Sequence, residues 1–203
     1  MKARANYMPP EEFNRVLEAI PKLHIRKWKD EDIQMMFKID YWCALRFDEG
    51  LNLNVEDFDM DMGQVYLGKT KTEKMGYATI PDSFRPELMI WLIGKTGTLF
   101  PGLSYGTAIK WIEKLGVICN IKAWTTPQSE SGEKTKTHIF RKSIGKDMIY
   151  GTYGTKAPIT FVSQTLRHKC KNPLAMTFKY LQVGDEDVKD YWKEIDKKNI
   201  ESV

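Results

Sequence analysis

The chain carries TLRH at residues 165–168, and Tyr180 follows the histidine of this motif by twelve residues, within TFKYL. Two further basic motifs lie upstream, ALRFDEGL at residues 44–51 and HIFR at residues 138–141. An arginine fork pairs with two phosphate oxygens at once and stays charged at any relevant pH. A tyrosine has an ordinary pKa of about 10 and needs nearby cations to become a nucleophile. Together the motifs indicate a site that transfers a phosphoryl group.

In this order, the motifs resemble the catalytic domain of the tyrosine recombinases, the phage integrase family. ALRFDEGLNLNVEDFD at residues 44–59 resembles the family pattern of Leu-Arg, an acid three residues later (Glu49) and an acid-aromatic-acid segment. HIFR fits the His-x-x-Arg box, and TLRH resembles the Leu-Gly-His element, with Arg167 replacing the glycine. Tyr180 comes about three residues later than in the commonest pattern, and we expect a loop around residues 171–173 to absorb the extra length.

The resemblance implies a mechanism that needs neither metal nor ATP, and therefore no cofactor. Tyr180 would attack a DNA phosphate, form a 3′-phosphotyrosyl bond and release a 5′ hydroxyl. The two arginines and His168 would stabilise the transition state, and His168 would hydrogen-bond either the scissile phosphate or the tyrosine. His138 would help to manage protons, and Lys71 would protonate the leaving oxygen, while Glu49 would hold a local backbone or basic group. The implied catalytic residues are Arg46, Lys71, His138, Arg141, His168 and Tyr180.

Lys71 is assigned from the run VYLGKTKTEKMGYATIP at residues 65–81, which resembles the hairpin that delivers the family's catalytic lysine. Lys69 and Lys74 are alternatives for this role, and hairpin lysines are also often only solubilising. Lys142 stands where the family often has a histidine after the box arginine. The residues that we expect to contact DNA are Lys69, Lys74, Lys136, Lys142, Arg167 and Lys169.

Each motif also has a simpler interpretation. Arg46 could pair with Asp48 or Glu49 at a helix end, and Tyr180 could be an interfacial aromatic residue on an amphipathic helix. Tyr191 is a second candidate nucleophile, although its flanking residues match no family motif. The occurrence of the motifs in the family's order favours the catalytic interpretation.

The net charge is +4, but it is unevenly distributed. Residues 134–171 contain nine Lys or Arg and one acid, a net charge of +8, which leaves −4 for the rest of the chain. Such a distribution is typical of a protein that binds a polyanion. A solvated lysine-rich loop is the alternative, and charge alone does not separate the two.

Composition places the chain among globular domains that lie inside the cell. Its 203 residues, 42% of them hydrophobic, suit one domain with its own core. No run approaches the roughly 20 apolar residues of a membrane helix, and we expect no membrane contact. Three widely spaced cysteines favour neither a disulfide framework nor a metal site, so we expect a reducing setting such as the cytoplasm, the nucleoid or a virus-infected host cell.

We expect a mainly helical α+β domain with a small antiparallel sheet over residues 1–184. Apolar residues recur at helical spacing after Pro9 and again from Asp30 to Leu45, which places Arg46 near the end of the second helix. Two strand-like runs, at residues 64–67 and 77–81, enclose the lysine-rich hairpin. Residues 125–137 form a polar loop, and further helices are predicted at residues 82–94, 105–116, 138–150, 159–168 and 173–182.

Residues 185–203 are predicted to form a separate amphipathic helix, whose apolar face comprises Val188, Tyr191, Trp192 and Ile195. Family members act as tetramers on two duplexes, and the resemblance implies double-stranded DNA as the partner and a homotetramer on it. The protein in solution could be a monomer. The helix would then dock on a neighbouring protomer, although packing within its own chain is an equal alternative.

The resemblance leaves some questions of function open. Few residues precede Arg46, so the chain is either a catalytic fragment of a longer integrase or a short recombinase without a DNA-clamping domain. A type IB topoisomerase uses similar residues and the same covalent chemistry, and the compact length and the Leu-x-His element favour the recombinase. A catalytically inactive DNA-binding relative is the other alternative.

Overall fold

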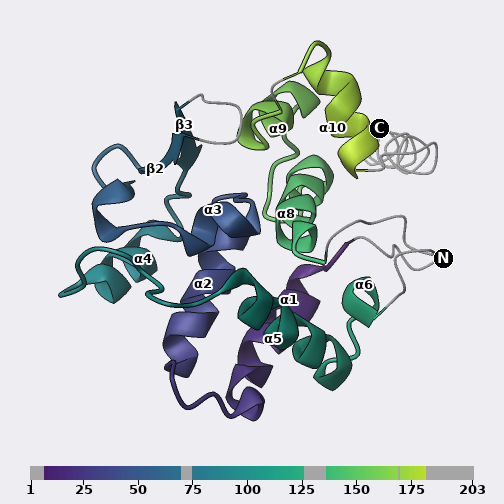
Figure 1. The fold of residues 1–203 in the computed structure, drawn as a ribbon. Coiled ribbons are helices and arrows are strands. Elements are labelled where there is room, and N and C mark those ends of the chain that lie inside the picture. The colour runs from purple at the N-terminus through teal and green to yellow at the C-terminus, as the bar shows by residue number, and fades with distance from the viewer. Residues whose placement is uncertain (1–6, 70–74, 126–135, 169, 182–203) are drawn as a thin grey trace.

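A computed structural model describes residues 7–69, 75–125, 136–168 and 170–181. The described part is mainly helical and carries one small antiparallel sheet, as expected (Figure 1). Its helices are α1 Pro10–Ala19, α2 Asp30–Trp42, α3 Phe47–Leu51, α4 Arg85–Leu92, α5 Tyr105–Ile118, α6 Lys122–Thr125, α8 His138–Tyr150, α9 Ile159–Thr165 and α10 Pro173–Leu181. Its strands are β1 Phe58–Asp59, β2 Gln64–Lys69 and β3 Met75–Thr79.

Helix α2 ends earlier than its apolar pattern predicts. The helix stops at Trp42, and Ala44 lies in the left-handed region with φ 49°. This turn breaks the helical hydrogen-bond ladder, so Arg46 becomes the N-cap of the separate helix α3 and does not lie on α2. The carbonyls at the end of α2 are thereby left for other donors, which is important for the site described below.

The core is built around Phe140, the residue that precedes Arg141. Its ring lies 5.1 Å from that of Phe37 in α2, 5.9 Å from Phe13 in α1 and 5.6 Å from Trp124 in α6. Phe140 is 1% exposed, so these contacts fix the rotation of α8 about its axis. The helix α6 that supplies Trp124 was not predicted from the sequence.

A buried carboxylate ties α8 to α2 and to the chain before α1. The hydroxyls of Tyr41 and Tyr7 each donate to Asp147 at 2.5 Å, and the Met8 backbone N–H donates to the Ser143 hydroxyl at 2.9 Å. Burial raises the pKa of Asp147, while the two tyrosine hydrogen bonds oppose that rise. The network satisfies polar groups on one side of α8, and Arg141 lies elsewhere on the same helix.

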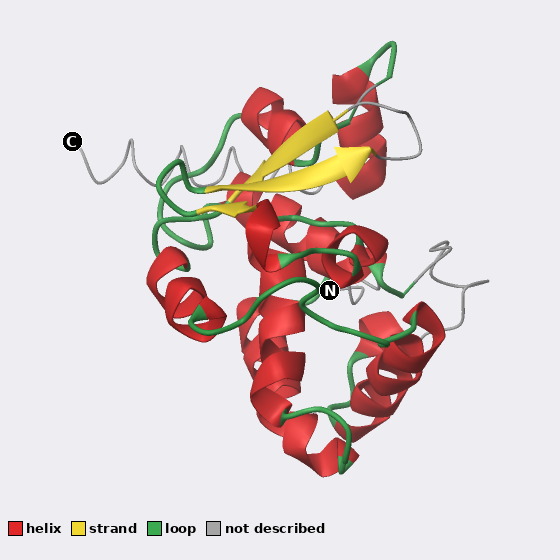
Figure 2. Ribbon diagram, turned by 60° about the vertical axis from the view of Figure 1, so that its left-hand side comes forward, coloured by secondary structure: helices red, strands yellow, loops and turns green. Residues whose placement is uncertain are grey.

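The sheet has the order β1-β2-β3 and is antiparallel throughout (Figure 2). Val65 on β2 pairs with Ala78 on β3, and both side chains are buried, at 0% and 4% exposure. Their neighbours Tyr66 and Tyr77 also pair, with ring centroids 5.6 Å apart, on the opposite face. The residues between β2 and β3, including Lys71 and Lys74, lie outside the described residues.

Within the described residues, none of the helices has the length and hydrophobicity that crossing a membrane requires.

Candidate active site

Arg46 stands at the start of α3, where Glu49 holds it, and this is the pairing that the simpler interpretation of Arg46 predicted. The Arg46 backbone N–H donates to Oε2 of Glu49 at 2.7 Å, and Nη1 of Arg46 donates to Oε1 at 2.6 Å. The first contact is the acid-to-backbone half of a helix capping box. The Arg46 side chain remains 46% exposed, so its guanidinium is fixed at one edge and open to solvent elsewhere.

Arg141 lies beneath this position and is almost completely buried, at 2% exposure. Its Nη1 donates to the Ala44 carbonyl at 2.5 Å, whereas its buried Nη2 has no hydrogen-bond partner among the described residues. Burial, followed by repulsion from Arg167, lowers the pKa of Arg141 to about 9. A buried guanidinium nitrogen without an acceptor favours binding of an anion.

Arg167, one of the residues that we expected to contact DNA, is largely buried against Glu49 and the end of α2. Its Nη2 donates to Oε2 of Glu49 at 2.7 Å and to the Ala44 carbonyl at 3.1 Å. Nη1 lies 3.5 Å from the Cys43 carbonyl, and the side chain is 10% exposed. These carbonyls are the ones that the early end of α2 leaves open, and the negative end of the helix dipole favours a cation there.

The backbone of Arg167 also explains the element that TLRH resembles. Its φ is 49°, in the left-handed region where glycine has no steric penalty. An arginine therefore adopts a conformation here that glycine would adopt without strain. The ion pair with Glu49 is a contact that a glycine could not make.

Tyr180 lies in a group of three rings, with His138 and His168 as its neighbours. Its ring centroid is 5.1 Å from that of His168, nearly perpendicular at 80°, and 6.2 Å from that of His138. His138 is the first residue of α8, and Tyr180 is carried by α10, which begins only at Pro173. Tyr180, which comes later than in the commonest family pattern, thus lies beside both histidines.

The charged groups of the site sum to a net positive charge. Burial and the charges of Arg141, Arg46 and Arg167 lower the pKa of His168 to about 4, which makes the ring neutral at physiological pH. Burial opposes the ionisation of Glu49, but Arg167 and Arg46 outweigh it and lower the pKa of that carboxyl. One carboxylate thus faces three guanidinium groups, an arrangement that suits a bound phosphate.

The predicted DNA-contacting lysines have several different placements. Lys142 is 5% exposed, with its ammonium 5.1 Å from the centroid of the Tyr180 ring, so it lies inside the site and not on an open surface. Lys136 pairs with Glu113 at 3.3 Å. Lys74 and Lys169 lie outside the described residues, as does the candidate catalytic Lys71, and the side chain of Lys69 is not described.

Two features of the site have no signal in the sequence motifs. One is the pair of backbone carbonyls of Cys43 and Ala44, which depends on where α2 ends. The other is Thr177, whose hydroxyl lies 2.8 Å from Nδ1 of His168. The T-x-x-Y spacing puts Thr177 on the same helix as Tyr180, but only the folded loop brings it against His168.

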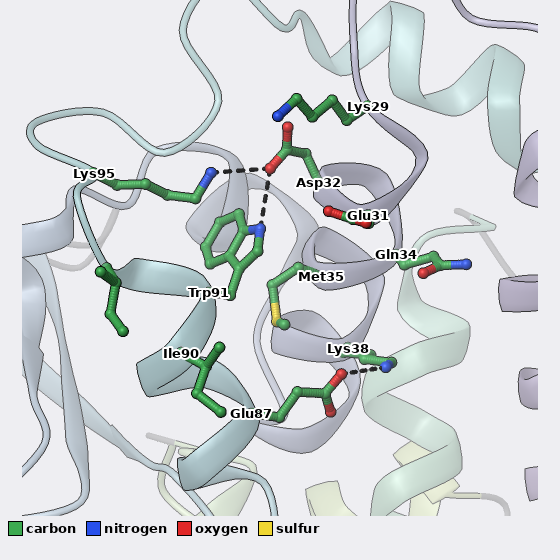
Figure 3. Close-up of a pocket in the computed structure, with 11 residues that line it drawn as sticks. Lys29, Glu31, Asp32, Gln34, Met35, Lys38, Glu87, Ile90, Trp91 and Lys95 are labelled. Atoms are coloured by element: carbon green, nitrogen blue, oxygen red, sulfur yellow. Dashed lines mark hydrogen bonds and ion pairs between the residues drawn. The ribbon is translucent and has the colours of Figure 1, made fainter.

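A separate open pocket of about 420 Å³ lies between α2 and α4 (Figure 3). Trp91 and Lys95 both donate to Oδ1 of Asp32, each at 3.0 Å, and Lys38 pairs with Glu87 across the pocket. The described residues that line it include none of the predicted catalytic residues, so this pocket does not mark the site.

The chain is similar in structure to three proteins that act in DNA recombination or integration. XerA recombinase matches with a TM-score of 0.66 and 17% identity, over 93% of this chain and 62% of XerA. XerH site-specific recombinase, in a post-cleavage complex with palindromic difH substrate, matches with a TM-score of 0.66 and 20% identity, over 92% of this chain and 51% of XerH. The catalytic domain of bacteriophage HP1 integrase matches with a TM-score of 0.61 and 19% identity, over 92% and 93% of the two chains.

These similarities confirm the predicted fold class. The chain spans less than two thirds of the length of XerA and XerH. A comparison with curated protein sequences gives no match. The sequence itself matches the phage integrase family over residues 6–187, and the chain therefore belongs to that family.

Proposed function

We propose that this protein cleaves and rejoins DNA strands as a site-specific recombinase, through a 3′-phosphotyrosyl intermediate on Tyr180. The observation that carries the proposal is the buried guanidinium of Arg141, whose Nη2 has no acceptor among the described residues. Arg46 and Arg167 surround the same region, and a phosphate would supply the missing acceptor and balance the charge. Membership of the phage integrase family supports this interpretation.

The proposed nucleophile and the proposed phosphate ligands lie on different helices. Tyr180 is carried by α10, whereas Arg46 lies at the start of α3 and Arg141 lies in α8. The nucleophile and the residues that would bind the phosphate are therefore held by different helices. The Tyr180 oxygen would form a bond to phosphorus while the bond to the 5′ oxygen breaks, and guanidinium groups would stabilise the added negative charge. The departing oxygen would receive a proton from a lysine, for which Lys71 is our candidate.

Strand exchange would follow from the same chemistry in reverse. The phosphotyrosyl bond conserves the energy of the broken phosphodiester, so a 5′ hydroxyl of a second duplex can attack it without ATP. We propose double-stranded DNA as the partner and a homotetramer as the assembly on it. XerH, a similar protein, is described in complex with difH substrate both before and after cleavage. Residues 185–203, outside the described residues, remain our candidate for contacts between protomers.

The test is covalent trapping. A pool of nicked, partly randomised duplexes is incubated in EDTA with the wild type, Tyr180→Phe or Tyr191→Phe, and the products are resolved on a denaturing protein gel. We expect a DNA adduct with the wild type and Tyr191→Phe, and none with Tyr180→Phe. Sequencing of the trapped DNA would then identify the target site.

Other outcomes would count against the proposal. Salt-sensitive binding without any adduct would point to an inactive DNA-binding relative. An adduct with relaxation of supercoiled plasmid, but without exchange between duplexes, would point to a topoisomerase. An adduct that persists in Tyr180→Phe would place the nucleophile elsewhere.

A further inference from the structure

Three basic residues of α8 lie on one face of the helix, toward Tyr180. His138 is the first residue of α8, and Arg141 and Lys142 follow it by three and four residues, the spacing that puts side chains on one face. The ring centroid of His138 lies 6.2 Å from that of Tyr180, and the Lys142 ammonium lies 5.1 Å from the Tyr180 centroid. Besides the arginine that we propose to bind phosphate, α8 therefore presents a second cation, which faces the nucleophile.

The contact between Lys142 and Tyr180 is part of the packing of α8 against α10. Lys142 is only 5% exposed. Leu181, next to Tyr180, lies so close to Gly145 of α8 that an added Cβ would be 3.0 Å from it, which fixes the end of α10 against α8. Burying an ammonium is costly unless a partner compensates it, and the π face of an aromatic ring is such a partner. The fold therefore holds this lysine at the ring and not on an open surface.

We infer that Lys142 is a positioning residue, whose ammonium holds the ring of Tyr180 and stabilises the negative charge that develops on the tyrosine oxygen during strand cleavage. This role rests on the proposed function and deepens it. A cation over the ring attracts a neutral tyrosine, and it attracts a tyrosine that carries negative charge more strongly. The interaction is thus stronger in the reacting state than in the resting state, which is the condition for an increase in rate.

The charge on Tyr180 changes in both halves of the reaction. In cleavage, the O–H bond of Tyr180 breaks and its proton passes to the solvent, while the oxygen uses its electron pair to bond to phosphorus. The bond between phosphorus and the 5′ oxygen breaks, and this oxygen takes a proton from a lysine ammonium. In rejoining, a 5′ hydroxyl loses its proton and bonds to phosphorus, and the tyrosine oxygen leaves with the electron pair and regains a proton. Because the tyrosine oxygen is buried, water solvates its charge poorly and a nearby cation has a larger effect.

The titratable and charged groups that face Tyr180 come from both helices packed against α10. Among the described residues, they are His138, Arg141 and Lys142 of α8 and His168 after α9. Behind them, the charges of Arg46, Glu49 and Arg167 act on Arg141 or His168. Burial and the three arginines lower the pKa of His168 to about 4, so this ring is neutral at physiological pH. A substitution of Lys142 alone leaves all these groups in place, so its effect on Tyr180 can be isolated.

The effect can be measured in the free protein, without any assay of cleavage. The full chain is labelled with ¹³C at the tyrosine Cζ atoms, and Tyr180→Phe assigns the signal of Tyr180 among the nine tyrosines. A pH titration then gives the midpoint at which Tyr180 ionises. In Lys142→Met we expect this midpoint to rise by about one pH unit or more, since an opposite charge within about 4–6 Å favours the charged form by such an amount. Lys142→Arg keeps a cation and should stay close to the wild type.

The matched control is Lys179→Met, which removes an exposed lysine next to Tyr180 on α10. It should leave the midpoint unchanged, because solvent and salt screen an exposed charge. Lys142→Gln is a second neutral variant and should shift the midpoint as Lys142→Met does, so the result does not depend on the folding of one variant. A midpoint that moves no more in these two variants than in Lys179→Met would overturn the inference.

Cleavage rates at several pH values provide a second test. The pH profile of single-turnover cleavage by Lys142→Met should move to higher pH by the same interval, so the rate at neutral pH falls about tenfold for each unit. Lys142→Arg should restore most of this rate. A rate that falls equally at every pH would indicate a merely structural role, and a loss confined to the affinity for DNA and its salt dependence would place Lys142 on a phosphate. Either result overturns the inference, whereas an adduct in the wild type shows in each case that the proposed function itself holds.

Discussion

At the scale of single residues, Glu49 connects two of the arginines of the site. Its carboxylate accepts from the backbone and the side chain of Arg46 and from the side chain of Arg167. Arg167 also donates to the Ala44 carbonyl, which accepts from Arg141 as well. Arg167 therefore connects the two arginines that we propose to bind phosphate, although its own side chain is turned inward.

This connection predicts coupling between Glu49 and Arg167. A glycine at position 167 adopts the left-handed backbone without strain, so Arg167→Gly removes only the contacts of the side chain. Glu49→Gln removes the negative charge with which the Arg167 side chain pairs. We expect each variant to slow single-turnover cleavage and the double variant to be no slower than the worse single one, a coupling of about 0.5–3 kcal/mol. Strictly additive effects would mean that Arg167 acts independently of Glu49, for instance through DNA.

Arg141→Lys should separate charge from geometry. A lysine keeps the positive charge, but it cannot donate to the Ala44 carbonyl and to a phosphate through one planar fork. We expect cleavage to fall by about 10²–10³-fold, the effect of losing one donor to a developing negative charge. Arg15→Lys, at an exposed arginine of α1, is the matched control. Wild-type cleavage by Arg141→Lys would show that the fork is not needed.

Asp40 predicts a pH dependence of stability. Neither of its carboxyl oxygens has a hydrogen-bond partner among the described residues. Burial, followed by the charges of Glu49 and Asp48, raises the pKa of Asp40 well above its ordinary value of 3.8. As the pH rises above that ordinary value, the unfolded chain releases this proton while the folded chain keeps it, so stability is lost.

Asp40→Asn removes that titration. The free energy of unfolding of Asp40→Asn relative to the wild type should therefore increase from about pH 4 to about pH 7. Urea denaturation at both pH values measures it, with the exposed Asp61→Asn as control. A difference that stays constant with pH would show that Asp40 ionises in the folded protein as it does in the unfolded chain.

Among the elements, the close approach of α8, α9 and α10 places the tyrosine (Figure 1). A Cβ on Gly145 of α8 would lie 3.0 Å from Leu181 of α10 and 3.2 Å from Leu166 at the end of α9. Contacts this short require the neighbouring side chains to move. Gly145 therefore sets how near α10, and with it Tyr180, comes to His138 and Arg141.

Gly145→Ala tests this packing against Gly106→Ala in α5, where an added Cβ meets nothing within 4 Å. Gly106 is exposed, and Gly106→Ala should increase the free energy of unfolding by about 0.5–1 kcal/mol, because alanine has the higher helix propensity. In Gly145→Ala, crowding against the two leucines should offset this stabilisation, which urea denaturation would measure. The variant should also cleave more slowly in single-turnover experiments. Equal stabilisation by both variants would mean that α10 has room to move.

The sequence allowed most elements to be predicted, because apolar spacing reports which helix faces are buried. Helix α8 was predicted with its observed ends, and Glu49 holds Arg46 as expected. The predicted end of α2 was wrong, because nothing in the sequence indicates that Ala44 adopts a left-handed backbone conformation. Lys142 and Arg167 were expected to contact DNA. Their burial beside Tyr180 and Glu49 could not be inferred from residue type, because charged residues are usually exposed.

At the scale of the whole molecule, the structure shows where part of the unevenly distributed positive charge lies. In the basic segment 134–171, Arg141, Lys142 and Lys146 are at most 5% exposed, and Arg167 is 10% exposed. Four of the nine basic residues of this segment are thus held inside the fold. Among them, Arg141 and Arg167 donate to the Ala44 carbonyl, and Lys142 lies beside Tyr180. The site joins residues from the start of α3, from α8 and from the α9–α10 region, so it exists only when these parts are folded together.

The most direct test of this account is to locate the DNA on the protein. The trapped adduct is digested with a nuclease and a protease, and the modified peptide is sequenced by mass spectrometry. The account predicts a 3′-phosphonucleotide on the oxygen of Tyr180. A nucleotide on Tyr191, or on any other residue, would contradict it.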